Sequence, residues 1–375
     1  MSRTFIPSLT GLRGAAAIWV FLFHIVPLGS GADLPLIRMG YVGVDIFFVL
    51  SGYILGHVHF DDFQDLTFVN YRRFIWLRLS RIYPVHFVTL MATAYFAATL
   101  YFLGVPVTQD PRFSWVVFVA NFLLVQAWGW YDYFSFNTGA WSISAEFLMY
   151  LCFPLLVFVV RRLSPMRSMA IGFLLLALEI TVLSLLERSA SNSVALAPLR
   201  IVGEFCCGLG TYAAFRSGLL KALPWHWITD GLTLAFVVIL LADSYFAALA
   251  VTPLLILGLA QGRGTVSRIL SHRHMIFLGE ISYSLYMVHG LVLDIGFAPL
   301  HYTRLAAGGW GLYGLASLLC VGLTAIATLV MHRFVEVPAR KWMRQTIASE
   351  PSSADFGAVA PARPQGLPNG AGDND

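Results

Sequence analysis

The chain has 375 residues, of which 58% are hydrophobic and 12% are charged, and its formal net charge is +4. Soluble domains carry about twice that share of charge, since roughly a quarter of their residues are Asp, Glu, Lys or Arg. The composition therefore excludes a water-soluble globular protein, and the scattered positive charge argues against nucleic-acid binding. It predicts an all-α polytopic membrane protein.

Eleven hydrophobic segments follow one another along the chain. Each approaches the length of about 20 mostly apolar residues that a membrane-spanning helix needs. They lie at 9–28, 41–57, 83–104, 113–130, 140–160, 169–187, 198–215, 225–242, 246–261, 279–299 and 309–331.

The positive charges between these segments indicate that one of them does not cross. Two arginine clusters, three segments apart, should both be cytoplasmic, and an odd number of crossings cannot connect them. The clusters are Arg72, Arg73, Arg78 and Arg81, and Arg161, Arg162 and Arg167. The weakest segment between them is 113–130, which we expect to be re-entrant or interfacial. Ten transmembrane helices remain, with sixteen Lys and Arg inside, five outside and both termini cytoplasmic.

The C-terminal residues have a different composition. Residues 1–345 form the predicted transmembrane domain, and 346–375, rich in Pro, Gly, Ala and Ser, read as a disordered cytoplasmic tail. Elsewhere, His57 and His59 with Asp61 and Asp62 resemble a metal site, but no further ligand spacing accompanies them, and we predict no metal.

Ionisable residues inside spans are functional candidates, and the first span holds two. Arg13 and His24 are eleven residues apart, which places them on one helix face about 16 Å apart along the axis. With the N-terminus inside, Arg13 lies towards the cytoplasm and His24 towards the outer leaflet. Taken alone, the pair also fits an interfacial anchor and a packing histidine.

Two carboxylates are expected at the depth of His24. Asp45 lies near the outer end of the second span, and Glu146 near the outer end of the fourth. A carboxylate in contact with an imidazole orients it and raises its basicity, as acid–base catalysis requires. Ser51 and Gly52 lie deeper in the second span, where small residues permit the close approach of a helix or of a thin ligand. Arg200 and Glu204 are four residues apart and predict a local ion pair.

The basic run after the second segment has two interpretations. Arg78 and Arg81 are neighbours on one helix face, and Arg72 and Arg73 precede them. Such charges contact lipid headgroups and set topology. Alternatively they bind phosphate, for which the guanidinium is geometrically suited.

Seven sequence blocks occur in order between residue 8 and about residue 342. They are Leu9–Gly14 with His24, Gly43–Gly52, Arg78–Pro84, Trp141–Glu146 with Tyr150 and Pro154, Arg200–Phe205, Gly279–His289 and Phe334–Pro338. In this order they resemble the acyltransferase family 3 membrane proteins.

That resemblance implies a multi-pass enzyme of the bacterial inner membrane, an acyl-CoA-dependent O-acyltransferase of EC 2.3.1 type. Such an enzyme moves an acyl group, usually acetyl, from cytoplasmic acyl-CoA to a hydroxyl of a cell-envelope or exported carbohydrate, or of a small glycosylated molecule. Acyl-CoA is its co-substrate, and no permanently bound cofactor is implied. The expected partners are membrane lipid, acyl-CoA and the glycosylated acceptor, with no nucleic acid, and a homo-oligomer is compatible with the sequence.

The family's R-x10-H element maps onto Arg13 and His24, and its R-x-x-R element onto Arg78 and Arg81. The sequence departs from the family in two ways. Leu77 stands where the loop commonly has a first arginine of a pair. Many members also carry a periplasmic domain, whereas we expect the membrane domain or a partner to handle the acceptor here.

We therefore expect acyl-CoA to dock with its phosphates on Arg78 and Arg81, helped by Arg72 or Arg73. The pantetheine arm passes Arg13 and Ser51. His24, oriented by Asp45 or Glu146, then deprotonates the acceptor hydroxyl, or a transient acyl-His24 intermediate forms. Three further site candidates are Trp141, Tyr286 and His289, for which packing and gating remain open.

A rival function is a proton-coupled transporter of a small organic solute, for which buried His, Asp and Glu also suit a proton relay. Against it, the two halves of the chain do not resemble each other, and the R-x-x-R element has no clear role in a carrier. A non-catalytic partner of a flippase is the third possibility.

Overall fold

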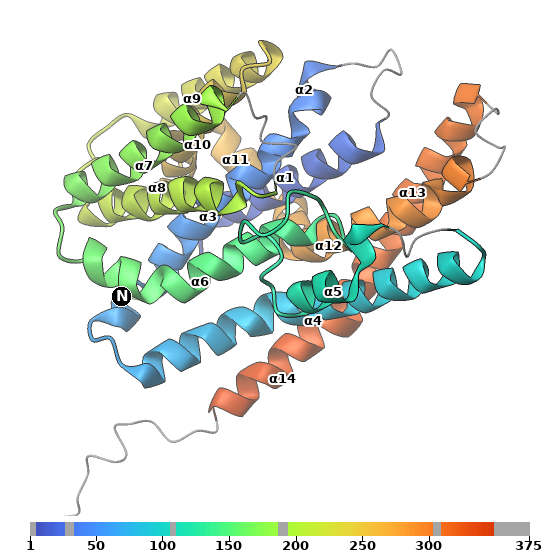
Figure 1. Ribbon diagram of the computed structural model, residues 1–375. Coiled ribbons are helices and arrows are strands. Elements are labelled where there is room, and N and C mark those ends of the chain that lie inside the picture. The colour runs from blue at the N-terminus through green and yellow to red at the C-terminus, as the bar shows by residue number, and fades with distance from the viewer. Residues whose placement is uncertain (1–4, 27–33, 106–109, 187–193, 303–308, 349–375) are drawn as a thin grey trace, which may run out of the picture.

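The computed structural model describes residues 5–26, 34–105, 110–186, 194–302 and 309–348 (Figure 1). All regular elements in these ranges are helical, which confirms the predicted all-α class. Of the predicted tail, residues 346–348 end the last helix and 349–375 lie outside the described residues.

The longer helices cover the ten segments that were predicted to span the membrane. They are α1 (Pro7–Ile25), α3 (Val42–His59), α4 (Phe68–Phe102), α6 (Ala140–Val160), α7 (Pro165–Leu185), α8 (Ala197–Ser217), α9 (Trp225–Leu241), α10 (Tyr245–Ala260), α12 (Arg273–Tyr302) and α13 (Gly309–Met331). The shorter elements are α2 (Pro35–Arg38), η1 (Met39–Tyr41), η2 (Phe60–Phe63), η4 (Pro111–Phe113), α5 (Trp115–Phe122), α11 (Thr265–Leu270), the π-helical η6 (His332–Glu336) and α14 (Val337–Ala348).

Seven stretches of the described chain are long and apolar enough to cross a membrane, which makes this a multi-pass membrane protein. Helices α9 and α10 are apolar but have 17 and 16 residues. Helix α8 coincides with another predicted span but carries Arg200, Glu204 and Arg216. The total of ten crossings and the cytoplasmic termini stay predictions.

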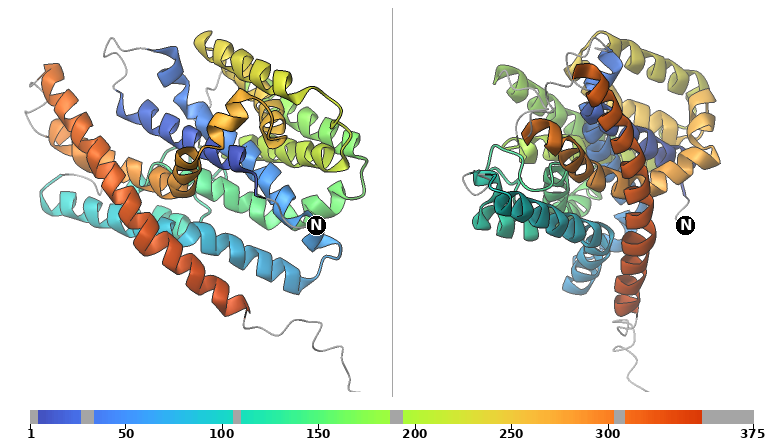
Figure 2. Two further views of the ribbon diagram at one scale, coloured as in Figure 1. Left: turned by 180° about the vertical axis from the view of Figure 1, so that it is seen from behind. Right: turned by 90° about the vertical axis from the view of Figure 1, so that its right-hand side faces the viewer.

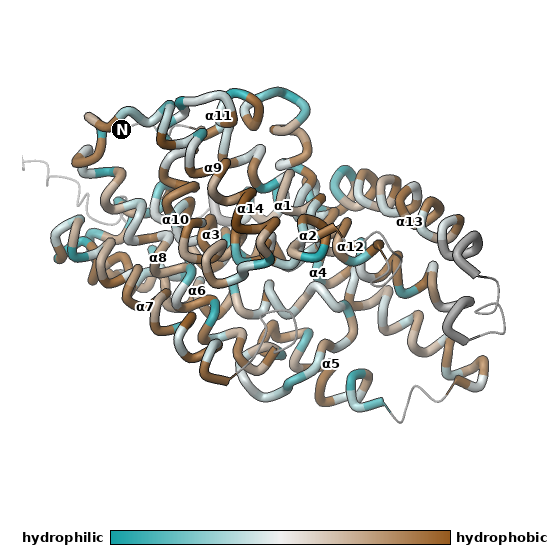
Figure 3. The backbone as a smooth tube through the Cα atoms, turned by 90° about the horizontal axis from the view of Figure 1, so that it is seen from above, coloured by the Kyte–Doolittle hydropathy of each residue, from teal (hydrophilic) through white to brown (hydrophobic). Residues whose placement is uncertain are grey.

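Large apolar side chains cover the outer faces of two peripheral helices. Helix α7 exposes Leu174, Leu178 and Leu185, and α13 exposes Leu318 and Ile326 among others. Figure 3 shows hydrophobic residues along these helices. Apolar side chains on the outside of an apolar bundle are what contact with lipid requires.

The segment around 113–130 contains only a short helix. Helix α5 has eight residues and measures about 12 Å, whereas the hydrocarbon core is about 30 Å thick. The irregular chain after α5 is bonded to α6. The Ser144 hydroxyl donates to the Leu124 carbonyl over 2.8 Å, and the Trp128 indole donates to the Ser144 carbonyl over 3.0 Å. These bonds satisfy polar groups that lipid cannot.

Helix α4 begins well before residue 83, where the predicted span began. Its N-cap is Thr67, whose side chain accepts a hydrogen bond from the Asn70 backbone NH over 3.3 Å. The basic run is therefore the first half of one 35-residue helix rather than a loop that leads into it. A hydropathy scan misses this half because its arginines offset its apolar residues.

Glycines let the central helices approach closely. A Cβ on Gly279 of α12 would lie 1.9 Å from the Thr10 carbonyl oxygen of α1, and one on Gly52 of α3 would lie 2.0 Å from the Phe205 carbonyl oxygen of α8. Small residues at such crossings permit backbone contact in membrane bundles. These contacts hold α1, α3, α8 and α12 together in the middle of the molecule (Figure 1).

Replacing Gly279 by Leu is therefore expected to destabilise the protein by about 1–3 kcal/mol or more, because the crossing cannot absorb a side chain. The measurement is thermal unfolding in detergent. Gly322→Leu on α13 is the matched control, since nothing lies within 4 Å of a Cβ at Gly322. Equal unfolding temperatures for the two variants would contradict the expected role of the Gly279 crossing.

Candidate active site

A cavity of about 130 Å³ lies where α1, α3, α4, α6 and α12 meet. Its polar lining consists of three arginines, one glutamate, three serines and three tyrosines over an apolar wall. These are Arg13, Arg78, Arg81, Glu146, Ser51, Ser142, Ser282, Tyr150, Tyr283 and Tyr286. The structure thus gathers four residues predicted for acyl-CoA binding, namely Arg13, Ser51, Arg78 and Arg81, with Glu146 and Tyr286.

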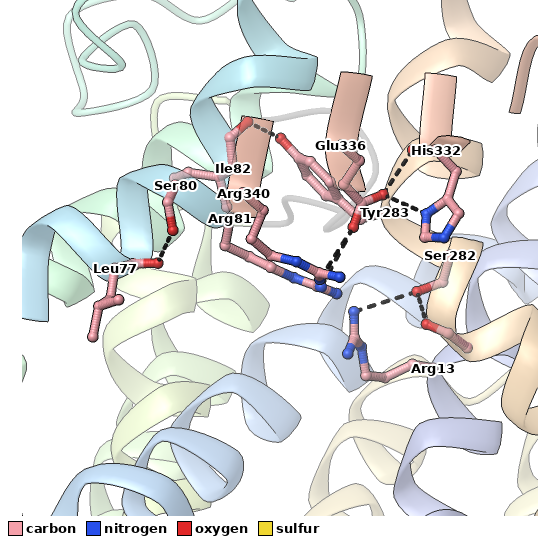
Figure 4. Close-up of polar contacts among 12 residues, drawn as sticks. Arg13, Leu77, Ser80, Arg81, Ile82, Ser282, Tyr283, His332, Glu336 and Arg340 are labelled. Carbon is pink, nitrogen blue, oxygen red and sulfur yellow. Dashed lines mark hydrogen bonds and ion pairs between the residues drawn. The ribbon is translucent and has the colours of Figure 1, made fainter. Parts of the chain in front are cut away.

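Two of the arginines are held by neighbouring helices (Figure 4). The Arg13 guanidinium, from α1, donates to the Ser282 hydroxyl of α12 over 3.4 Å. Arg81 of α4 lies 3.4 Å from the Glu336 carboxylate, which is 1% exposed. Helices α1 and α4 therefore each supply a cation whose position is fixed by a side chain of another helix.

Glu146 and Tyr286 are also positioned by serines. The Ser51 hydroxyl of α3 donates to the Glu146 carboxylate of α6. The Ser142 hydroxyl of α6 donates to the Tyr286 hydroxyl of α12 over 2.8 Å. These bonds tie α3 to α6 and α6 to α12 around the cavity.

The charges in this cavity suit an anion. Three guanidiniums line it against one lining carboxylate, and the Arg78 Nε atom is buried without a hydrogen-bond partner among the described residues. A buried donor of this kind costs free energy unless a ligand pairs with it. Arginine binds phosphate and carboxylate with two parallel hydrogen bonds, which makes these the expected ligand groups.

His24 lies outside the cavity. Its Nδ1 is 2.8 Å from the Val20 carbonyl oxygen, and its exposed ring has its centroid 5.1 Å from that of the buried His289. The centroid of the His289 ring is in turn 5.6 Å from that of Tyr286, which lines the cavity. We call Tyr286 and His289 the ring wall, because they separate the arginine-lined cavity from His24.

The expected contact between His24 and Asp45 is wrong. Asp45 is buried in an ion pair with Arg200 of α8, with 2.5 Å between their oxygen and nitrogen atoms. The Tyr245 hydroxyl also donates to Asp45 over 3.4 Å. Arg200 is 2% exposed, and a buried guanidinium needs a counter-charge. Asp45 therefore pairs with Arg200 of α8, although its depth in the membrane had suggested a contact with His24.

The other residues predicted for the site lie partly inside and partly outside the cavity. Glu146 is engaged by Ser51, as described above. Trp141 packs on Arg200, whose guanidinium carbon is 5.0 Å from the indole centroid. Arg72 and Arg73 are exposed on α4 and do not line the cavity.

The acidic residues near His57 take part in ion pairs. Asp61 accepts from Arg161 over 3.3 Å and from Arg216 over 2.9 Å, and Asp62 lies 2.8 Å from His59. The residues that resembled a metal site thus tie α6 and α8 to the end of α3.

Glu336 is the site residue that sequence reasoning placed least well. The sequence analysis includes it only within the block Phe334–Pro338, yet its carboxylate accepts a hydrogen bond from Ser284 of α12 over 2.8 Å and lies 3.0 Å from His332. The block Phe334–Pro338 was the one signal for it. The structure shows that Glu336 supports the cavity through Arg81.

Comparison with known proteins adds an independent finding. The sequence profile of the acyltransferase domain family matches residues 6–331. The acyltransferase MdmB of Streptomyces mycarofaciens is 29% identical over 93% of this chain and 96% of its own length. A Staphylococcus aureus protein named "Putative O-acetyltransferase" is 24% identical over 90% of this chain, which spans 58% of that protein. No solved structure matches the chain.

Proposed function

Because this chain belongs to the acyltransferase domain family, we propose that it is an integral membrane O-acyltransferase that uses cytoplasmic acyl-CoA. The proposed acceptor is a hydroxyl of a cell-envelope or exported carbohydrate, and the proposed location is the bacterial inner membrane. The observation that carries the donor assignment is the cavity in which Arg13, Arg78 and Arg81 meet Ser51 and Glu146.

Acyl-CoA matches this cavity in charge and in length. Its phosphates are the anionic groups that guanidiniums bind best. Arg13 lines the cavity, and His24 lies eleven residues further along α1, a separation of about 16 Å. A pantetheine arm of about 15–20 Å spans that separation, so phosphates near the inner arginines place the thioester towards His24.

We propose acetyl as the acyl group. The name of the staphylococcal relative, which specifies O-acetyl transfer, agrees with this proposal.

We place the transfer step beside His24, where the thioester, led past Tyr286 and His289, meets the acceptor hydroxyl. The His24 imidazole takes the proton of the acceptor hydroxyl, and the resulting oxygen nucleophile attacks the thioester carbonyl. The carbon–sulfur bond breaks, and the thiolate recovers the proton to leave as CoA thiol. An acyl-His24 intermediate is the alternative route, with the same products.

The decisive experiment compares surface and exported glycans, by mass spectrometry, from cells with and without this gene. Loss of one acyl ester is the expected result. Proton-gradient-driven uptake of a solute by the purified protein, without acyl transfer, would instead establish the transporter.

A second measurement tests the donor site. Arg78→Gln and Arg81→Gln are each expected to raise the KM for acetyl-CoA about tenfold or more, since each removes a charge-assisted hydrogen bond of about 1.5–3 kcal/mol. Arg263→Gln, an exposed arginine near α11, is the control and should leave KM unchanged. An unaltered KM in both cavity variants would refute the phosphate contact.

A further inference from the structure

Helix α14 continues the last long helix beyond the bundle. Helices α13, η6 and α14 run on as one rod along the side of the molecule (Figure 2). The rod lies against the first half of α4, where the Trp76 indole donates to the Met343 carbonyl over 2.7 Å. This contact places α14 beside the helix that supplies Arg78 and Arg81.

The surface of α14 carries a basic groove. Its twelve residues include Arg340, Lys341 and Arg344 and no Asp or Glu. These three cations, with Val337 and Gln345, line a groove of about 420 Å³, which is within the usual size range of small-molecule sites.

The positive charge at this place exceeds the nearby negative charge. The buried carboxylate of Glu336 lies 3.4 Å from Arg81 and 3.8 Å from Arg340, so two guanidiniums share it (Figure 4). Arg344 follows Arg340 by one helical turn and interacts electrostatically with both Arg340 and Arg78. Like charges one turn apart destabilise a helix unless an anion pairs with them.

The arginines form a continuous series from the cavity to the groove. Arg13 lies in the cavity, Arg81 bridges it to Glu336, and Arg340 and Arg344 lead outwards along α14. A donor whose pantetheine arm runs from the cavity arginines towards His24 extends its nucleotide in the opposite direction, past Arg81. Arg340 shares the Glu336 carboxylate with Arg81, so the groove of α14 begins next to that arginine.

We propose that α14 binds the phosphates at the nucleotide end of acyl-CoA through Arg340, Lys341 and Arg344. This inference rests on the proposed function and extends the donor site beyond α4. Anionic lipid headgroups offer the same phosphate chemistry at a membrane surface, so the experiment must separate the two sources.

The test uses the full-length protein in phosphatidylcholine vesicles. The double variant Arg340→Gln and Arg344→Gln is expected to raise the KM for acetyl-CoA at least tenfold with little change in kcat. Its KM for acetyl-pantetheine, which lacks the nucleotide and its phosphates, should not change. Arg333→Gln, an exposed arginine of η6 outside the groove, is the control for net charge and should match the wild type.

The single variant Arg344→Gln controls for misfolding of the double variant. Arg344 is exposed, whereas Arg340 contacts the buried Glu336 and its replacement can disturb the fold. The single variant should raise the KM for acetyl-CoA severalfold. An unchanged KM in both groove variants, with normal turnover in the wild type, overturns this inference and leaves the proposed function intact. A KM defect that needs phosphatidylglycerol in the vesicles assigns the groove to lipid and also overturns it. Absence of acetyl-CoA turnover in the wild type refutes the proposed function itself.

Discussion

Replacing His24 by Ala is expected to lower kcat for acyl transfer by about 100- to 10,000-fold, the range that a positioned acid–base group contributes. The KM for acetyl-CoA should change little, because His24 lies outside the arginine-lined cavity. Initial rates of CoA thiol release, measured over a range of acetyl-CoA concentrations, separate the two constants.

His226→Ala, at an exposed histidine of α9, is the matched control for loss of an imidazole. Membrane insertion and unfolding temperature establish that both variants fold. Mass spectrometry of protein incubated with acetyl-CoA alone distinguishes the two routes, since an acyl-His24 intermediate adds one acetyl mass to the wild type and none to His24→Ala. Full activity in His24→Ala would rule out both routes.

Replacing Asp45 by Ala is expected to cost about 3–5 kcal/mol of folding stability, the loss found when one partner of a buried ion pair is removed. The pair is fully enclosed, with Arg200 at 2% and Asp45 at 0% exposure. Removing the carboxylate takes away the ion-pair partner that lies 2.5 Å from the buried guanidinium. Thermal or denaturant unfolding of the purified protein in detergent measures the loss.

An exposed ion pair provides the control. Arg38 and Asp243 lie 2.8 Å apart with exposures of 41% and 46%, so Asp243→Ala should cost no more than about 1 kcal/mol. The double variant Asp45→Leu and Arg200→Met should recover much of the stability, because it removes both members of this ion pair. Similar losses for the two alanine variants would show that the buried pair contributes little.

The same double variant also tests the predicted catalytic role of Asp45. A folded protein without Asp45 and Arg200 that retains acyl transfer would confine this pair to structure. A double variant that folds but does not transfer acyl groups would support a functional role for Asp45. Stability and turnover must therefore be measured on the same preparation.

The helical class and the positions of most helices could be predicted because a lipid environment demands long apolar runs. Helical spacing predicted that Arg78 and Arg81 share a face, whereas the placement of Arg13 on the same donor path rested on the family resemblance. For Asp45 the sequence predicted the depth of the residue in the membrane but not the direction in which its side chain points around the helix axis. Depth placed it beside His24, whereas the packing of α3 on α8 turned it towards Arg200.

The features that the sequence did not predict depend on contacts between distant parts of the chain. Glu336 and α14 follow the last span, and no local sequence pattern predicts that they contact α4. Arg72 and Arg73 share a helix with Arg78 and Arg81 but point to the surface. Which side of an amphipathic helix meets the bundle depends on its neighbours, so the charges alone could not rank these four arginines.

The ring wall has a consequence for the cell's energy supply. An enzyme that joins reactants from opposite sides of a membrane can let ions leak through and so dissipate the proton-motive force. Tyr286 and His289, with Phe21 at 6.3 Å from His289 between ring centroids, fill the space between the cavity and His24 with aromatic rings. Closely packed rings impede hydrated ions, so under the proposed function Tyr286 and His289 would limit ion leakage at the place where the two reactants meet.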